Sequence, residues 1–580
     1  MVIERGVIWP DLRASWIVYE DADVLAVDKP ARVPTEPSDP PQDDDLRARL
    51  TRFIVQRDGR SSSTYLGVHH LLDAETSGLV LYARRREANA GLARQVEARE
   101  LVREFVAAVT GWRGGARVLR HRLGRGEGAR LAVVGARDSR GKDAELAVTV
   151  LARVADRTLL SCRIVAGGPL TLRTQLALEG TPIVGENLYA SGAQRDSVDD
   201  AEVPPRLLLH ARRLALAHPL TGAPLELVAE PPAVFDDWLR RGARAPFDDP
   251  RVLRERLADA LEARYGLARL ADVSPATTTF RLVNELGDGL PGVAVDLYGE
   301  HLVVHLHGDT PAAFADEIFE ALSTLGFAGT YAKYRPKQAN TLVDTRRDDL
   351  APLFPVRGVA TAGPTSTVYE YGLPLEVRLG DGLSTGLFLD QRDARRRVRE
   401  LAADARVLNL FAYTCAFSAA AAAGNARVTV SVDASREVLA LGERNVSNAR
   451  ALSGTSGDDR FVRADVFEAL ARLQKSGETF DLIIADPPTY ATTHASRWTS
   501  GASWRGLAAQ CVALLAAGGR LLASSNDRRL SATKFRRLLR EGAREAGRAI
   551  REMKDLPAGR DFPSIAGSEP HLKSVFVVVE

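Results

Sequence analysis

Short apolar runs, most of which end in a carboxylate, recur in the C-terminal part of the chain. They occupy residues 405–411, 427–433, 461–465 and 480–486. The last three end at Asp433, Asp465 and Asp486, and small residues typical of a helix start, 419–424, follow the first. Strands that alternate with helices form a parallel, doubly wound sheet, and the carboxyl ends of its strands meet at one edge. We therefore expect a Rossmann-like α/β unit that carries polar side chains along that edge.

The residues at these strand ends favour one kind of ligand over another. Asp433 lies about 22 residues beyond the end of the first strand, where an acid binds ribose hydroxyls in doubly wound sheets. No GxGxxG loop follows that strand, which argues against a dinucleotide such as NAD, because a pyrophosphate needs close backbone approach. Asp486-Pro-Pro-Thr-Tyr490 instead offers carboxylate and carbonyl oxygens for the NH groups of a planar base, with an aromatic ring to stack on it. This combination indicates methyl transfer to a base.

Motifs upstream of the first strand carry a family resemblance. Thr385-Gly-Leu-Phe-Leu-Asp-Gln-Arg392 precedes that strand, and Arg281-Leu-Val-Asn284 and the glycine-rich residues 287–299 lie farther upstream. With these motifs, the stretch from Phe280 to the C-terminus resembles the class I S-adenosylmethionine methyltransferases. Among them it looks like the large-subunit ribosomal RNA methyltransferases that modify cytosine C5 or guanine N7. The resemblance implies S-adenosyl-L-methionine as the cofactor and RNA, specifically large-subunit ribosomal RNA, as the partner.

The same resemblance implies the roles of individual residues. Cofactor-binding side chains are expected at Phe388, Asp390, Arg392, Asn409, Thr414, Asp433 and Asp465. Groups that hold the target base are expected at Asp486, Pro487 and Tyr490. Cys415 and Ala416 stand where the family has glycines at its tightest turn, so a side chain is expected where the backbone should approach the cofactor.

The cysteines bear on which atom accepts the methyl group. Methylation at cytosine C5 requires a thiolate that adds to the base, hence a cysteine beside it. Cytosine-modifying relatives carry that cysteine after the fifth strand, where this chain has Ser524-Ser525-Asn526. The chain's cysteines are Cys162, Cys415 and Cys511, none of them at that place. The sequence therefore favours a nitrogen acceptor.

Landmarks in the N-terminal part resemble a second family. Val68-His-His-Leu-Leu-Asp-Ala-Glu-Thr-Ser-Gly78 lies between expected strands at 24–28 and 79–83, and by itself Asp73 reads as a turn residue. Together with Arg173 and the stretches 180–189 and 207–222, the region from about 24 to 235 resembles the pseudouridine synthases whose catalytic loop reads His-Arg-Leu-Asp-x-x-Thr-Ser-Gly. The resemblance implies that Asp73 is the catalytic aspartate and Arg173 its partner. A nearby guanidinium would keep the carboxylate ionised as it attacks or deprotonates a flipped-out nucleotide.

Departures from that family leave alternatives open. Leu71 replaces an arginine of the loop, Gly168-Pro-Leu-Thr171 replaces Arg-Thr-His-Gln, and Phe105 replaces a tyrosine. Lost arginine and histidine contacts weaken the grip on RNA. One reading is a bifunctional enzyme, with methyltransferase and isomerase activities. A second keeps the methyltransferase beside a catalytically dead domain that guides RNA, and a third is a non-catalytic RNA-binding ribosome-assembly factor.

These patterns divide the chain into three units. We expect a pseudouridine synthase-like α+β domain at 1–245, a linker helix and small α+β RNA-binding domain at 246–376, and a class I methyltransferase domain at 377–580. Residues 240–250 form a charged, proline-containing connector, and 251–266 have the apolar spacing of a helix. Aromatic and basic residues interleave at 331–337, as on a single-stranded RNA surface or on an ordinary charged edge.

Composition limits which kinds of binding site and cellular location the sequence allows. Among 580 residues, 77 are Lys or Arg and 75 are Asp or Glu, so the net charge is +2 and an RNA site must be a local patch. The cysteines show no paired spacing, which argues against disulfides and zinc. His301, His305 and His307 share a strand face without an acid or cysteine at ligand spacing, so no metal is expected there. No run reaches the roughly 18–20 apolar residues of a membrane helix, and we expect a cytoplasmic protein.

Overall fold

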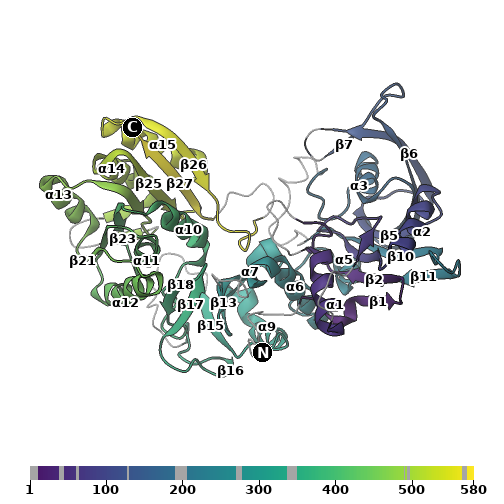
Figure 1. Cartoon of the computed structure of the whole chain (residues 1–580), viewed down its shortest axis with the longest axis horizontal. Coiled ribbons are helices and arrows are strands. Elements are labelled where there is room, and N and C mark those ends of the chain that lie inside the picture. The colour runs from purple at the N-terminus through teal and green to yellow at the C-terminus, as the bar shows by residue number, and fades with distance from the viewer. Residues whose placement is uncertain are drawn as a thin grey trace.

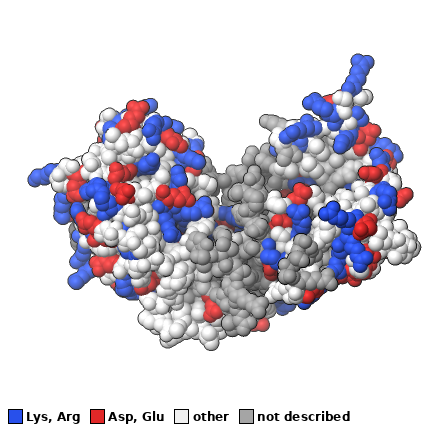
Figure 2. Space-filling view, viewed as in Figure 1, with Lys and Arg blue, Asp and Glu red and all other residues white. Residues whose placement is uncertain are grey.

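The computed structural model describes residues 11–37, 45–59, 65–126, 128, 130–189, 206–269, 277–335, 349–488, 490–492, 497–564 and 571–580. It has two lobes, an N-terminal one in purple and blue and a C-terminal one in green and yellow, with the teal elements between them (Figure 1). Basic and acidic side chains are interspersed over both lobes on the face that Figure 2 shows, in agreement with the small net charge. None of the described helices is both long and apolar enough to cross a membrane.

The N-terminal lobe is built on one large mixed sheet. Its strands are β1 (Ile17–Glu20), β2 (Val24–Lys29), β3 (Gly67–Val68), β4 (Ser77–Ala83), β5 (Val102–Thr110), β6 (Arg117–Arg125), β7 (Leu131–Val133), β8 (Lys142–Val154), β9 (Arg157–Ala166), β10 (Leu209–Ala217) and β11 (Pro224–Val228). The order is β1-β2-β4-β10-β5-β9-β8-β6-β7, with β3 on β4 and β11 on β10. The strands expected at 24–28 and 79–83 are β2 and β4.

Helices cover both faces of this sheet because its central strands are apolar on both sides. The helices are α1 (Leu46–Asp58), α2 (Arg86–Glu97), α3 (Pro169–Leu178) and α5 (Ala233–Arg241). On β5, Phe105 packs with α1 and α3, whereas its neighbour Val106 packs with α5. Alternation along a strand thus assigns successive residues to opposite cores.

The central elements form a smaller α+β unit. They are α6 (Pro250–Ala263), α7 (Tyr265–Arg269), β12 (Thr279–Asn284), β13 (Val293–Tyr298), β14 (His301–His307), α8 (Asp309–Ala313), α9 (Ala315–Ser323), β15 (Gly329–Arg335) and β16 (Arg357–Gly358), with the strands paired in chain order. Helix α6 starts after Asp249, whose carboxylate accepts from the Arg251 amide at 3.0 Å, and the helix expected at 251–266 therefore begins one residue earlier. Leu253, Leu257 and Leu261 pack on this sheet.

The C-terminal lobe contains the doubly wound sheet. A hairpin of β17 (Ser366–Glu370) and β18 (Leu373–Val377) precedes α10 (Arg392–Leu401), β19 (Arg406–Leu410), α11 (Ala416–Ala423), β20 (Val428–Asp433), α12 (Arg436–Ser453), β21 (Asp458–Arg463), α13 (Val466–Ser476), β22 (Phe480–Ala485), β23 (Tyr490–Thr492), β24 (Arg497–Thr499), α14 (Ser500–Ala513), β25 (Leu515–Ser525), α15 (Ala532–Glu545), β26 (Ile550–Leu556) and β27 (Lys573–Val579). The sheet order is β21-β20-β19-β22-β25-β27-β26, parallel except for β27. The carboxyl ends of β19, β20 and β22 lie together, as the sequence predicts.

The described residues that were expected to face RNA in the central unit are buried or half-buried. Tyr331 and Lys333 on β15 are 2% and 0% exposed, and the Lys333 ammonium donates to the carbonyl of Gly382. Arg335 donates to the carbonyl of Leu383 at 2.6 Å. The prediction of a stacking surface is therefore wrong for Tyr331 and Lys333, while Lys337 lies outside the described residues. Lys333 and Arg335 instead hold the loop that leads to Ser384.

Candidate functional site

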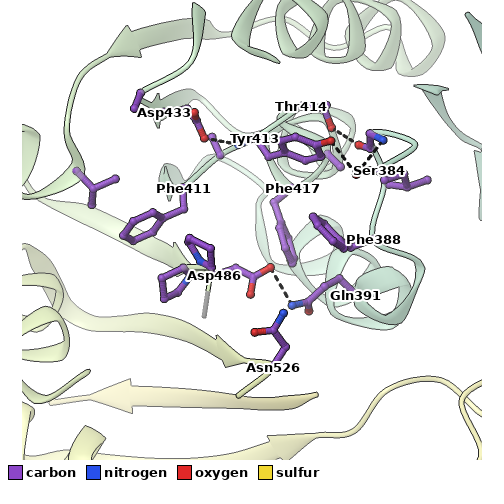
Figure 3. A pocket seen from close by; sticks show the side chains of 18 of the residues that line it. Ser384, Phe388, Gln391, Phe411, Tyr413, Thr414, Phe417, Asp433, Asp486 and Asn526 are labelled. Atoms are coloured by element: carbon purple, nitrogen blue, oxygen red, sulfur yellow. Dashed lines mark hydrogen bonds between the residues drawn. The ribbon is translucent and has the colours of Figure 1, made fainter. Parts of the chain in front are cut away.

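A cavity of about 450 Å³ opens at the carboxyl edge of the C-terminal sheet. Its lining is mostly apolar, with aromatic side chains of Phe388, Phe411, Tyr413 and Phe417 around it (Figure 3). The rings of Phe388 and Tyr413 lie 5.7 Å apart. The volume falls within the range of small-molecule sites, in which a few polar groups fix orientation.

The turn after β19 brings backbone to this cavity. Phe411, Tyr413 and Cys415 all have left-handed φ angles, near +50°, which non-glycine residues adopt rarely and mainly at functional sites. Thr414 lines the cavity between them, and its hydroxyl donates to the Gly386 carbonyl at 2.6 Å. The turn thus fixes the loop before α10 against the loop after β19.

Of the two residues that replace glycines at the turn, Ala416 lines the cavity, whereas Cys415 does not occupy it, contrary to the expectation from the sequence. Its side chain is 0% exposed and packs against Gly442 of α12 on the far side of the turn, where a Cβ at position 442 would overlap the Cys415 Sγ and Cβ atoms. The glycine missing from the turn is therefore compensated by a glycine in the facing helix. Burial also raises the pKa of the Cys415 thiol to about 12, so the thiol stays protonated.

We predict that Gly442→Ala destabilises the protein by about 1–3 kcal/mol, because the added methyl group overpacks the contact with Cys415. Chemical unfolding measures the change. The double variant Gly442→Ala with Cys415→Gly should recover most of the lost stability, since the second substitution removes the overlapping side chain and suits the left-handed backbone. A double variant no more stable than Gly442→Ala would contradict this packing.

Two acids lie where the sequence places them at the cavity. Asp433 at the end of β20 accepts from the Tyr413 and Ser435 amides, each at 2.9 Å, through different carboxylate oxygens. Each oxygen keeps a lone pair for a further donor such as a ribose hydroxyl. Asp465 lines the cavity and also caps α13, accepting from the Phe467 amide at 2.9 Å. One aspartate thus serves both the helix terminus and the site.

Two residues expected beside the cofactor do not line the cavity in the structure. Arg392 is buried in a two-bond ion pair with Asp561, at 2.7 and 2.8 Å, which ties α10 to the loop before β27. Asn409 lies beneath the turn, where its amide donates to the Ser418 hydroxyl at 2.9 Å. Neither lines the cavity. Both side chains find internal partners that the sequence alone did not reveal.

The opposite end of the cavity carries a pair of carboxylates. Asp486 and Asp390 both line it, and Pro487 lies beside Asp486. Burial, reinforced by the negative charge of Asp390, raises the pKa of Asp486 to about 7. The pKa of Asp390 is also raised by burial. The backbone of Tyr490 belongs to β23, and its side chain lies outside the described residues.

Gln391 and Asn526 complete this end of the cavity, and neither was assigned a role from the sequence. The Gln391 amide nitrogen donates to Asp486 Oδ2 at 3.0 Å, and Asn526 lies next to both (Figure 3). Both residues belong to motifs that the sequence shows, the stretch 385–392 and Ser524-Ser525-Asn526. The pattern marked the segments, but only the fold shows which of their side chains face the cavity.

No cysteine lines the described part of this cavity. Cys511 on α14 is 0% exposed within the core of the lobe, and burial raises the pKa of its thiol to about 12. Cys162 is buried in the N-terminal lobe.

A second group of charged side chains lies in the N-terminal lobe. Arg173 on α3 is 2% exposed and donates to both oxygens of Glu186, at 2.6 and 2.7 Å, and to Asp73 Oδ2. The Thr76 hydroxyl donates to the other oxygen of Asp73 at 2.7 Å. The Asp73 side chain is 31% exposed, so it faces solvent while its orientation is held. The structure therefore brings together the two residues that the sequence pairs, and adds Glu186.

A buried lysine fixes the loop that carries Asp73. The Lys29 ammonium donates to the carbonyls of Val33 at 2.8 Å and Ala74 at 3.1 Å. Burial lowers the pKa of Lys29 to about 7. Of the departures from the family, Phe105 lies in the core beneath this site, whereas Leu71 is 38% exposed. The bonds from Lys29 therefore fix this loop even though Leu71 replaces the arginine of the family.

One further grouping has ligand-like geometry. Single ligand atoms of Asp21, Asp23 and His218 lie within 4.8 Å of one another, and His218 Nε2 is 3.1 Å from Asp21 Oδ2. His305 is partnered differently, with its Nε2 3.0 Å from Asp296. The expectation of no metal stays a prediction.

Comparison with known proteins assigns both lobes. Residues 320–576 match the S-adenosylmethionine-dependent methyltransferases, and residues 23–178 match the RNA pseudouridylate synthases. Ribosomal RNA large subunit methyltransferase I of Alteromonas mediterranea is 33% identical over 360 residues, covering 58% of this chain and 86% of that protein. Its counterpart in Salmonella paratyphi C is 30% identical over 353 residues, covering 57% and 82%. A crystallised protein assigned as a methyltransferase, complexed with SAH, is 25% identical with a TM-score of 0.50, covering 63% and 87%.

Proposed function

This chain belongs to the ribosomal RNA large subunit methyltransferase I family, and we propose that it methylates a base of large-subunit ribosomal RNA. The lining of its cavity, rather than that membership, favours a nitrogen as the acceptor. The observation that carries the proposal is one cavity with Asp433 at one end and Asp486-Pro487 at the other. The first end suits a nucleoside cofactor and the second suits a base. The matched methyltransferase family uses S-adenosyl-L-methionine as its cofactor.

The residues present fit that cofactor. Asp433 retains acceptor capacity for ribose hydroxyls, and Asp465 and the aromatic rings surround a space that can hold an adenine. When bound, the cofactor supplies an electrophilic methyl group: the nitrogen lone pair forms the new N–C bond, and the pair of the broken C–S bond stays with sulfur. The protein's part is to align the base and to stabilise its charge. Since Cys415 points away from the cavity, the argument for a non-catalytic factor loses one of its supports.

The absence of a thiol from the described cavity supports nitrogen as the acceptor. A carbon acceptor at cytosine C5 needs a thiolate, whereas a nitrogen already has a lone pair. Asp486 and Pro487 can hold the base so that this lone pair faces the cofactor end. Asn526, in the stretch where cytosine-modifying relatives carry their cysteine, lines the cavity with an amide instead.

We predict that Asp433→Ala weakens S-adenosylmethionine binding about 100-fold, because two charge-assisted hydrogen bonds to the ribose are lost. Calorimetric titration of the full chain measures this, and methyl transfer to unmodified large-subunit ribosomal RNA should fall in parallel at limiting cofactor. Asp458→Ala, an exposed acid at the start of neighbouring β21, is the control and should bind like the wild type. Absence of cofactor binding by the wild type would overturn the proposal.

We also propose that the N-terminal lobe isomerises uridine in RNA. The observation that favours it is the ordered chain Glu186–Arg173–Asp73, in which a buried guanidinium faces a solvent-accessible carboxylate. A catalytically dead guide would have no need to hold both oxygens of this aspartate. The Arg173 guanidinium donates to Asp73 and holds its orientation, as a nucleophile or base requires.

A further inference from the structure

A groove of about 710 Å³ lies on the C-terminal lobe, apart from the cavity that Asp433 and Asp486 line. It is formed by the C-terminal half of α15 and the start of β26, which are labelled near the top of that lobe in Figure 1. Gly547, with a φ of +68°, follows α15 and helps to reverse the chain into β26. Four arginines and one acid line the groove: Arg540, Arg544, Arg548, Arg551 and Glu552.

Three of these arginines have no partner among the described residues. Arg540, Arg544 and Arg551 are exposed and make no hydrogen bond or ion pair there. Arg472, on the exposed face of α13, instead pairs with Glu468 one turn away at 3.3 Å. Arg540 and Arg544 are themselves one turn apart, and like charges at this spacing destabilise a helix. A cation in the last turn suits the helix dipole, which accounts for Arg544 but not for Arg540 or Arg551. The groove therefore carries charge that the fold does not use.

The fourth arginine, Arg548, fixes the shape of the groove. Its guanidinium donates to the backbone carbonyls of Leu515 at 3.0 Å, Ala516 at 3.2 Å and Glu580 at 3.1 Å. These bonds tie the turn after α15 to the start of β25 and to the residue that follows β27. The free cations are thus carried by a helix and a strand that are held together before a ligand arrives, which lowers the entropy cost of binding.

The groove lies at the opposite edge of the sheet from the cavity. At one end of β22, Phe480 pairs with Leu515 beside the groove, and at the other end Ala485 precedes Asp486 at the cavity. The six residues of β22 span about 20 Å by the usual rise of a strand. A ligand that contacts both sites must extend over at least that length. A single nucleotide is too short for this, whereas a folded RNA is long enough.

We propose that this groove binds the phosphate backbone of the RNA substrate at a point remote from the target nucleotide. The inference rests on the proposed function, since it assumes that RNA is the substrate. Guanidinium groups bind phosphate through paired, charge-assisted hydrogen bonds. Such contacts supply affinity and position a large RNA without reading its sequence. None of the described residues that line the groove is an aromatic anchor of the kind that protein partners use, which favours RNA over an acidic protein.

The test compares RNA binding by two variants that carry the same net charge. The groove variant replaces the three free arginines with glutamine: Arg540→Gln, Arg544→Gln and Arg551→Gln. The control variant does the same to three exposed arginines of this lobe that pair with acids: Arg397→Gln, Arg460→Gln and Arg472→Gln. The affinity of each full chain for a large-subunit ribosomal RNA transcript is measured between about 50 and 200 mM salt.

We expect the groove variant to bind this RNA at least about 10-fold more weakly at low salt, because phosphate contacts are lost. The slope of log affinity against log salt should also become less steep by about 3, close to one for each lost phosphate contact. The control variant should keep the slope of the wild type. If the two variants bind alike, the inference is wrong, and an acidic protein is the remaining class of partner.

Methyl transfer separates binding at the groove from a part in the reaction. The KM of the groove variant for the RNA should rise by the factor that its affinity falls, with kcat at saturating RNA and calorimetric affinity for S-adenosylmethionine unchanged. A lower kcat at saturating RNA would overturn the inference, since a remote phosphate site does not act on the methyl group. A wild type that binds the RNA but does not methylate it overturns the proposed function alone, and the two variants still decide the inference. A wild type that binds no RNA overturns both.

Discussion

Asp73→Asn is expected to abolish uridine isomerisation, by about 10⁴-fold, while methyl transfer continues at the wild-type rate. The substitution keeps the shape of the side chain and its bond with Thr76 but removes the charge that faces Arg173. The fold should hold, because Arg173 keeps its two bonds to Glu186. Release of tritium from RNA that contains 5-tritiated uridine measures the reaction, since the C5 hydrogen is lost when the base is reattached through C5.

The controls for Asp73→Asn distinguish a loss of activity caused by the substitution from a lobe that is inactive in the wild type. Asp143→Asn, on the exposed face of β8, should release tritium like the wild type. If the wild type itself releases none from unmodified ribosomal RNA, the N-terminal lobe is a guide for RNA and the second activity is wrong. If Asp73→Asn keeps the activity, another group is the catalytic one.

Asp486→Asn is expected to lower methyl transfer about 10²–10³-fold, because the substituted amide can no longer offset positive charge on the base. Tritium release should persist in this variant, which makes the two aspartates reciprocal controls for each other. Calorimetry should show S-adenosylmethionine binding close to that of the wild type, since Asp433 and Asp465 are untouched. A variant that retains full methyl transfer would show that Asp486 has no part in the reaction.

The pH profile gives Asp486 a second signature. Its pKa is raised to about 7, mainly by burial and then by Asp390, so the carboxyl group is largely protonated at pH 6 and ionised at pH 8. If the ionised form is required, kcat/KM of the wild type rises about tenfold per pH unit below 7 and levels off above it. Asp486→Asn should lose this dependence. A wild-type profile that is flat between pH 6 and 8 would contradict the requirement.

The sequence predicts the scaffold of the C-terminal lobe well because burial controls it. Strands buried on both faces need continuous aliphatic residues, and the runs at 405–411, 427–433 and 480–486 coincide with β19, β20 and β22 within a residue. The strand expected at 461–465 starts earlier, at Asp458, since the edge strand β21 is exposed and its polar residues hide it. The acids at strand ends follow from the same pattern, which is why Asp433 and Asp486 lie at the cavity.

Other site residues depend on contacts between segments far apart in the sequence. Arg392 belongs to a motif of the family, but its partner Asp561 lies 169 residues away. The position of Cys415 depends on Gly442 across a helix interface, and no local pattern indicates it. The sequence does not predict a role for Gln391 for a similar reason. Its amide reaches the site only because the fold places it beside Asp486. Motifs locate the segments of a site, and tertiary contacts decide which of their atoms face it.

Helix α6 joins the two halves in a way that the sequence expectation of a connector at 240–250 does not convey. Glu255 accepts from the Ala233 and Val234 amides at the start of α5, and Glu262 pairs with Arg49 of α1 at 2.7 Å. Val252 packs into the N-terminal lobe, whereas Leu253 packs into the central unit. Phe247, within the connector, is itself 1% exposed.

Two genes that encoded the halves separately would therefore yield two proteins of lower stability. A cut at residue 245 would leave α6 with one apolar side facing water and would strip α5 of the carboxylate at its first turn. The fusion is thus hard to reverse in evolution, since fission would need compensating changes on both new surfaces. A lineage that carries this arrangement is bound to inherit, lose or repurpose its two lobes together.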